Sequence, residues 1–332
     1  MKAYRFLSIM LLFLSCREES HKVNGVSFVA SREKVAQEHL DAVLAVNANY
    51  AAVMPFGFMP DVTSPEIHYD TERQWYGETK EGARQYIDQL HKNGLKVMLK
   101  PQLWIWRGTF TGTLKMDSEE KWLALESSYE AFIMHFANLA GETGVELFCI
   151  GTELGTFVRQ RPTYWFSLIK KIRTVYQGKL TYAANWDEYT NTPFWKEVDM
   201  IGIDAYFPLS QERTPTVAEL VEKWQPFKVR MQQLSEEMEK PILFTEFGYR
   251  SNDYTAMRPW TVDRHTDNIN MHAQTNATKA VFDAFWSEDW FRGGFVWKWF
   301  MDHKVSGGPT DNRFTPQNKP AEEVIRHYYK IY

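Results

Sequence analysis

Eight short apolar runs alternate with longer amphipathic segments along almost the whole sequence. Each run is bounded by Gly, Pro or Asp, and most are rich in β-branched or aromatic residues, as buried strands are. The runs are residues 25–30, 50–59, 95–105, 145–154, 180–189, 199–207, 241–249 and 293–300. Eight strand–helix units predict an α/β fold in which one domain forms a parallel (β/α)₈ barrel. A doubly wound open sheet is the alternative, and the lack of a phosphate-binding glycine loop argues against it.

The segments between these runs have the spacing of amphipathic helices. Residues 80–94 place Tyr86, Ile87 and Leu90 near one face and end on an Asn-Gly helix stop. Residues 31–46 predict a helix for which Ser31 is the N-cap. Further helices are predicted at 118–140, 162–177, 216–239, 269–287 and 318–332, with only one or two turns at 190–198.

The N-terminus precedes this pattern and resembles a bacterial export signal. Residues 6–15 form an apolar stretch that is too short to span a bilayer. Ser15 directly before Cys16 resembles a lipobox, in which the cysteine is lipidated; a plain signal peptide with a chance cysteine is the alternative. We therefore expect a signal peptide at 1–15, a tether at 16–24 and the barrel domain at 25–332. The lipid would hold the exported protein on the bacterial outer membrane or cell surface.

Charge and motif content exclude several classes of function. The chain has 38 Lys and Arg against 42 Asp and Glu, which gives no electrostatic case for binding nucleic acid or an anionic membrane surface. Cys149 is the only cysteine besides Cys16, so no disulfide is expected. The sequence has no serine-hydrolase elbow, no nucleotide-binding loop and no H-E-x-x-H zinc motif. We expect a monomer that uses neither a metal nor a cofactor.

Two stretches of similar pattern each place a glutamate at the end of a predicted strand. Glu153 lies in GTELG on the fourth strand, and Glu246 lies in FTEFG on the seventh. Active sites of such barrels lie at the C-terminal ends of the strands, so both carboxylates are expected at one cleft. Glycoside hydrolysis requires such a pair, one protonated to donate to the leaving oxygen and one ionised to attack the sugar. Either glutamate taken alone could instead be a structural residue that forms a salt bridge at the end of its strand.

Other polar and aromatic residues occupy the same strand ends. Indole rings stack on the flat C–H faces of sugars, while amides and charged groups bond to the hydroxyls. The predicted sugar-binding residues are Lys100, Trp104, Asn185, Trp186, Tyr206, Trp297 and Trp299. The alternative is that these tryptophans, as large aromatic residues, simply pack under loops.

Four stretches, KPQLW, GTELG, TEFGYRS and the closing FTPQNKPAEEVIRHYY, resemble glycoside hydrolase family 113 of the retaining clan A, whose known members are β-1,4-mannanases. The resemblance covers the chain from about residue 25 to its end. It implies that Glu153 is the acid/base and Glu246 the nucleophile. It also implies that the Tyr206 hydroxyl holds the nucleophile and that Trp297 forms the floor of the −1 sugar site.

One position departs from the general clan pattern. Thr152 stands where many clan A enzymes have an asparagine that contacts the sugar 2-OH. The axial 2-OH of mannose makes a different contact plausible, and Asn185 and Lys100 are candidate donors.

The resemblance implies a retaining hydrolase of β-1,4-mannan or manno-oligosaccharides, with 25–332 as its catalytic domain. Another clan A enzyme acting on glucan, xylan or galactan is one alternative. A surface glycan-binding lipoprotein without turnover is the other, and the presence of both glutamates argues against it.

Overall fold

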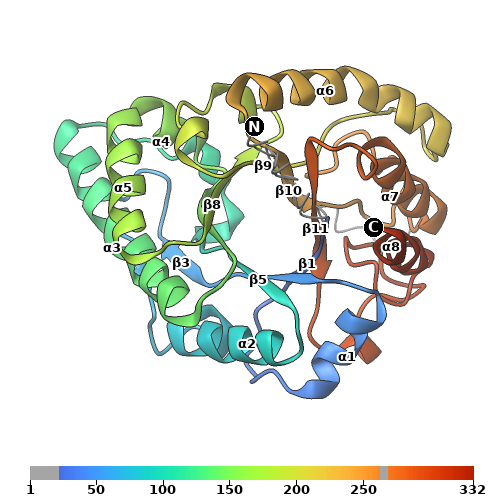
Figure 1. The fold of residues 1–332 in the computed structure, drawn as a ribbon, viewed down its shortest axis with the longest axis horizontal. Coiled ribbons are helices and arrows are strands. Elements are labelled where there is room, and N and C mark those ends of the chain that lie inside the picture. The colour runs from blue at the N-terminus through green and yellow to red at the C-terminus, as the bar shows by residue number, and fades with distance from the viewer. Residues whose placement is uncertain (1–21, 262–267) are drawn as a thin grey trace, which may run out of the picture.

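The computed structural model describes residues 22–261 and 268–332. Eight parallel strands close into a barrel, with helices packed around its outside (Figure 1). In chain order these strands are β1 (Val23–Phe28), β2 (Tyr50–Val53), β5 (Lys96–Leu99), β7 (Leu147–Thr152), β8 (Lys179–Asn185), β9 (Met200–Asp204), β10 (Ile242–Phe247) and β11 (Phe291–Trp299). The prediction of a (β/α)₈ barrel is therefore confirmed, and each predicted run contributes one barrel strand.

The predicted N-terminal segments fall mostly outside this description. The signal segment 1–15 and Cys16 lie outside the described residues. Residues 22–24, which we assigned to the tether, belong to the barrel instead, because β1 begins at Val23 and Lys22 is already buried.

Two of the longer apolar runs, 50–59 and 95–105, each form two strands, which the sequence did not lead us to expect. The breaks fall at Pro55 and Pro101, since proline has no N–H to donate to a central ladder. Beyond the breaks, β3 (Phe56–Met59) pairs in parallel with β6 (Gln102–Ile105) and antiparallel with β4 (His68–Tyr69). This small sheet continues from the C-terminal ends of β2 and β5, so it lies beside the mouth of the barrel.

The helices in the described part of the chain are α1 (Gln37–Ala45), α2 (Lys80–Lys92), α3 (Glu119–Thr143), α4 (Gly155–Gln160), α5 (Pro162–Val175), α6 (Val217–Met238), α7 (Met271–Phe285) and α8 (Pro320–Ile331). Seven of these eight helices lie within or close to the predicted segments, and the short helix α4 was not predicted. The segment 190–198 holds only short 3₁₀ turns, η4 (Tyr189–Asn191) and η5 (Trp195–Glu197), as expected. Among the described residues, no helix is long and apolar enough to cross a membrane.

The predicted N-cap of the first helix is wrong. The helix α1 begins at Gln37, six residues after Ser31. The Ser31 hydroxyl instead accepts the backbone N–H of Glu33, which closes a local turn. Val35 is buried and its N–H donates to the Gln85 side chain, so the chain first packs against α2 and only then turns into the helix.

Apolar side chains fill the interior of the barrel below the strand ends. A buried cluster inside the strands includes Met98, Cys149, Leu243 and Phe295. Gly25 is required there, because a Cβ at that position would lie 2.3 Å from the Phe295 ring. Cys149 is thus a small buried hydrophobic residue, as the sequence suggested.

Candidate active site

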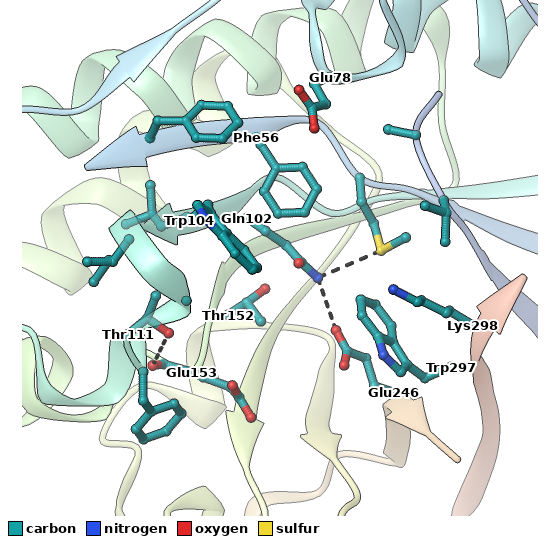
Figure 2. A pocket seen from close by; sticks show the side chains of 18 of the residues that line it. Phe56, Glu78, Gln102, Trp104, Thr111, Thr152, Glu153, Glu246, Trp297 and Lys298 are labelled. Atoms are coloured by element: carbon teal, nitrogen blue, oxygen red, sulfur yellow. Dashed lines mark hydrogen bonds between the residues drawn. The ribbon is translucent and has the colours of Figure 1, made fainter. Parts of the chain in front are cut away.

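A cavity of about 510 Å³ opens at the C-terminal ends of the barrel strands, and both predicted glutamates line it. Glu153 directly follows β7, and Glu246 lies near the end of β10. Figure 2 shows the two side chains reaching the same cavity from different sides, with Gln102 between the walls that Trp104 and Trp297 form. The strand-end positions inferred from the sequence therefore bring the two carboxylates to one site.

Three donors hold the carboxylate of Glu246. The Tyr206 hydroxyl donates to Oε2 at 2.8 Å, while Gln102 Nε2 and Lys100 Nζ donate to Oε1 at 3.0 and 2.5 Å. An ionised carboxylate only accepts hydrogen bonds, so this set of donors matches its ionised form. The side chain is only 6 % exposed, and its position is fixed from both oxygens.

Behind Glu246 lies a fully buried ion pair. Lys100 Nζ contacts Asp204 Oδ1 at 3.2 Å, and Asp204 also accepts from the Thr245 hydroxyl at 2.7 Å. Burial raises the pKa of Asp204 to about 7, and the charge of Glu246 adds to this while Lys100 opposes it. Burial alone would lower the pKa of Lys100, but the two carboxylates outweigh it and raise the pKa. One ammonium group therefore compensates two carboxylates.

Glu153 has a different environment. Its backbone adopts the left-handed region with φ of 51°, which a non-glycine residue rarely does and which commonly marks a functional position. The Glu153 N–H donates to the Ala183 carbonyl, and the Thr111 hydroxyl donates to the Glu153 carbonyl. Burial raises the pKa of the Glu153 carboxyl well above its usual value, and the charges of Asp204 and Glu246 raise it further. The site thus pairs a carboxyl that keeps its proton with a carboxylate that faces donors.

Several predicted sugar-binding residues do line this cavity. Trp104 forms one wall and is 49 % exposed, and Trp297 forms the opposite wall. Thr152 lines the cavity next to Glu153. The Tyr206 hydroxyl reaches Glu246 as the resemblance implied, although Tyr206 itself lies behind the carboxylate.

The structure contradicts other predicted sugar contacts. Lys100 and Trp299 are fully buried, so a sugar cannot reach either side chain. Asn185 is turned toward its own loop, where its amide donates to Asp187. Trp186 stacks on Trp260 at a ring-centroid distance of 5.3 Å, and among the described residues neither Asn185 nor Trp186 lines the cavity.

The sequence reasoning also missed residues of the site. Gln102 donates to Glu246, and Asp204 shares Lys100 with it. Gln102 lies two residues after Lys100, and this spacing could have suggested that both side chains face the same way. Lys298 lines the cavity beside Trp297, and burial lowers its pKa. Among the described residues, no group of three or more His, Cys, Asp or Glu side chains could hold a metal ion.

The chain is similar to known glycoside hydrolases over nearly its whole length. The sequence model of Glycoside Hydrolase Family 113 matches residues 28–319. The GH113 β-mannanase AaManA from Alicyclobacillus acidocaldarius, solved in complex with ManMIm, is 26 % identical with a TM-score of 0.81, over 94 % of this chain and 98 % of that one. A second GH113 β-1,4-mannanase is 23 % identical with a TM-score of 0.80, over 93 % and 99 %.

More distant structures share only the fold. A β-glucuronidase from Ruminococcus gnavus is 14 % identical with a TM-score of 0.60, over 93 % of this chain and 50 % of that one. No curated protein matches the sequence.

Proposed function

The chain belongs to glycoside hydrolase family 113, and on that basis we propose that it hydrolyses β-1,4-mannosidic bonds with retention of configuration. The observation that supports this most is the unequal carboxyl pair in one cavity, Glu153 with a raised pKa and Glu246 held by three donors. Such a division between an acid and a nucleophile is what double displacement needs. The GH113 β-mannanase and β-1,4-mannanase that resemble this chain over nearly their whole length support mannan as the substrate.

In the first step, the Glu246 carboxylate attacks the anomeric carbon and the glycosidic C–O bond breaks. Glu153 gives its proton to the departing oxygen, so no alkoxide has to leave. Lys100, Gln102 and Tyr206 fix the direction of the attacking carboxylate before the substrate arrives. The products are a glycosyl ester on Glu246 and the shortened saccharide.

In the second step, a water molecule attacks the anomeric carbon while the Glu153 carboxylate takes its proton. The ester bond breaks and Glu246 regains its charge. Because the ester carries no charge, one of the causes that raise the pKa of Glu153 disappears in the intermediate. The same residue can therefore act as an acid first and as a base afterwards.

The walls of the cavity suit a sugar ring between the two glutamates. Trp297 offers an indole face on one side, and Lys298 and Thr152 offer polar groups. Because Lys100 is buried and Asn185 faces its own loop, we propose that Thr152 and Lys298 contact the sugar hydroxyls instead.

Product analysis on β-mannan, β-glucan, xylan, galactan and their oligosaccharides tests the proposal. We expect release of manno-oligosaccharides from mannan and much slower release from the other polysaccharides. A strong preference for another polysaccharide would show that this polysaccharide, and not mannan, is the substrate. Binding of mannan without any cleavage would favour a glycan-binding barrel.

We further propose that the protein is exported, lipidated at Cys16 and anchored to the bacterial outer membrane or cell surface, where it acts as a monomer. The sequence of residues 1–16 supports the export and the lipidation. Labelling of the expressed protein with a fatty-acid analogue should be lost in Cys16→Ser. Equal labelling of this variant would contradict lipidation at that residue.

A further inference from the structure

Two of the stretches singled out in the sequence, TEFGYRS and the closing FTPQNKPAEEVIRHYY, meet in space beside the active site. The first spans residues 245–251 and continues from β10, and the second begins at Phe314, beyond β11. A lysine, Lys319, lies where they meet, and its side chain is fully buried. Within the described part of the chain, it is not among the residues that line the catalytic cavity.

Lys319 ties together the loops that follow β10 and β11. Its Nζ donates to the Ser251 hydroxyl, the Asp311 carboxylate and the Arg313 carbonyl, each at 2.9 Å. An ammonium group has three N–H bonds to donate, and all three are used here. The Ser251 hydroxyl in turn donates to the Asp311 carbonyl at 2.6 Å, which closes the connection between the two loops.

A second buried side chain holds the same two loops. Gln274 of α7 is fully buried, and its Nε2 donates to the Tyr249 carbonyl at 2.9 Å and to the Phe314 carbonyl at 3.1 Å. Tyr249 follows β10 and Phe314 follows β11, so Gln274 repeats the link that Lys319 makes. The loop 311–315 is therefore fixed against the segment directly after the strand that carries the nucleophile.

The loop 311–315 reaches the residue that holds the nucleophile. The Phe314 ring meets the Tyr206 ring edge to face, with a centroid distance of 5.9 Å and an interplanar angle of 71°. The Tyr206 hydroxyl donates to Glu246 at 2.8 Å. A continuous set of contacts thus runs from Lys319 through two aromatic rings to the attacking carboxylate.

A charged lysine at this buried position has an energetic cost. Burial lowers the pKa of Lys319 to about 8; Asp311 opposes this shift, and the charges of Arg250 and Arg313 add to it. A buried ion pair by itself is weak evidence for added stability, because apolar side chains of similar volume often serve equally well. The distinguishing feature of Lys319 is the set of three acceptors from two loops that it fixes at once.

We propose that Lys319 is a positioning residue for the nucleophile. Lys319 holds the loop 311–315 in place. Phe314 of this loop then keeps the Tyr206 hydroxyl on Glu246. The inference rests on the proposed function and deepens it, because it assigns an origin to the fixed direction of the attacking carboxylate.

Combined substitutions test this role. Lys319→Met keeps the length of the side chain and removes its charge. With an aryl β-mannoside, kcat/KM should fall about tenfold, mainly through kcat, because a displaced Tyr206 hydroxyl loses part of its charge-assisted bond. In the Tyr206→Phe background the same substitution should cost less than about twofold, since that bond is already absent. Losses that multiply fully in the double variant would overturn the proposal.

Lys22→Met is the matched control. Lys22 is also buried, burial also lowers its pKa to about 8, and its Nζ donates to the Glu288 and Phe291 carbonyls. It precedes β1 and so lies at the opposite end of the barrel from the active site. Lys22→Met should lower the melting temperature but leave kcat/KM unchanged. A tenfold loss of kcat/KM in this variant would show that general destabilisation explains the effect of Lys319→Met.

Ser251→Ala covers the case in which Lys319→Met does not fold. It removes a single oxygen atom, which accepts from Lys319 and donates to the Asp311 carbonyl. It should lower kcat/KM about threefold, and by less than twofold in the Tyr206→Phe background. Unchanged activity in Ser251→Ala would contradict the proposal.

Crystal structures of Lys319→Met and Ser251→Ala separate this inference from the proposed function, because they need no substrate. The distance from the Tyr206 hydroxyl to Glu246 Oε2, now 2.8 Å, should lengthen beyond the roughly 3.0 Å range of such a bond in at least one of them. An unchanged contact in both would refute the positioning role, whatever sugar the enzyme cuts. If the contact is lost but no mannoside is hydrolysed, the mannan assignment fails and the positioning role stands.

Discussion

Lys100→Met removes the ammonium group that contacts both Asp204 and Glu246 at the base of the active site. Lys100 and Asp204 are fully buried, and Glu246 nearly so. Loss of one partner from a buried ion pair costs about 3–5 kcal/mol, because the remaining charge stays buried without compensation. We therefore expect the melting temperature at neutral pH to fall by on the order of 10 °C.

The same substitution should change the pH dependence of activity. Without the cation, two neighbouring carboxylates would retain one proton to higher pH, and a protonated pair is a poor nucleophile. Two unit charges about 4 Å apart interact by ~4 kcal/mol at an effective dielectric of 20, which corresponds to roughly three pH units, and relaxation of the site reduces this. The acid limb of kcat/KM should therefore move upward by about one to three pH units.

Both effects are measured on purified variants with an aryl β-mannoside and by thermal melts at pH 5 and pH 7. The double variant Lys100→Met/Asp204→Asn is the control, because it removes one carboxylate together with the cation. It should recover part of the melting temperature and move the acid limb back toward that of the unaltered enzyme. A Lys100→Met variant with unchanged melting temperature and pH profile would refute the role of Lys100 as the positioning cation.

Three further outcomes are expected. Glu153→Gln should lower kcat/KM on manno-oligosaccharides by about 10²–10⁴. The loss should be far smaller on a dinitrophenyl mannoside, whose leaving group needs no proton. Equal losses on the two substrates would argue against Glu153 as the acid. Tyr206→Phe removes a charge-assisted hydrogen bond to Glu246 worth about 1.5–3 kcal/mol. We therefore expect kcat/KM to fall roughly 10- to 150-fold, mainly through kcat. A change in KM alone would contradict this expectation. Burial raises the folded-state pKa of Asp204 to about 7, so its contribution to stability is present at low pH and is lost as the pH rises from about 4 through 7. Melting temperatures from pH 4 to 8 should decline less in Asp204→Asn, and an identical decline would rule out Asp204 as its source.

The barrel and its two glutamates could be predicted from sequence because each depends on local pattern. Apolar runs between Gly, Pro and Asp locate the strands, and strand ends locate Glu153 and Glu246. The small sheet was missed because a run that continues through Pro55 or Pro101 has the composition of one long strand. Its pairing joins segments that are distant in sequence, and no local signal specifies that pairing.

Side-chain direction was the second limit. Trp297 and Trp299 both lie near the end of β11, yet only Trp297 lines the cavity while Trp299 is buried. Lys100 was a candidate donor to the sugar 2-OH because it lies on the predicted third strand among the polar residues near the barrel mouth. Its burial depends on Asp204, whose carboxylate comes from β9, three strands away from β5 around the barrel.

The anomeric configuration of azide products tests the assignment of the two glutamates most directly. Glu246→Ala and Glu153→Ala are each given an activated aryl β-mannoside and sodium azide, and the products are identified by NMR. Without the nucleophile, azide should attack from the opposite face and give the α-mannosyl azide. Without the acid/base, azide should attack the glycosyl ester and give the β-mannosyl azide. The same anomer from both variants, or the reverse assignment, would contradict the proposed mechanism.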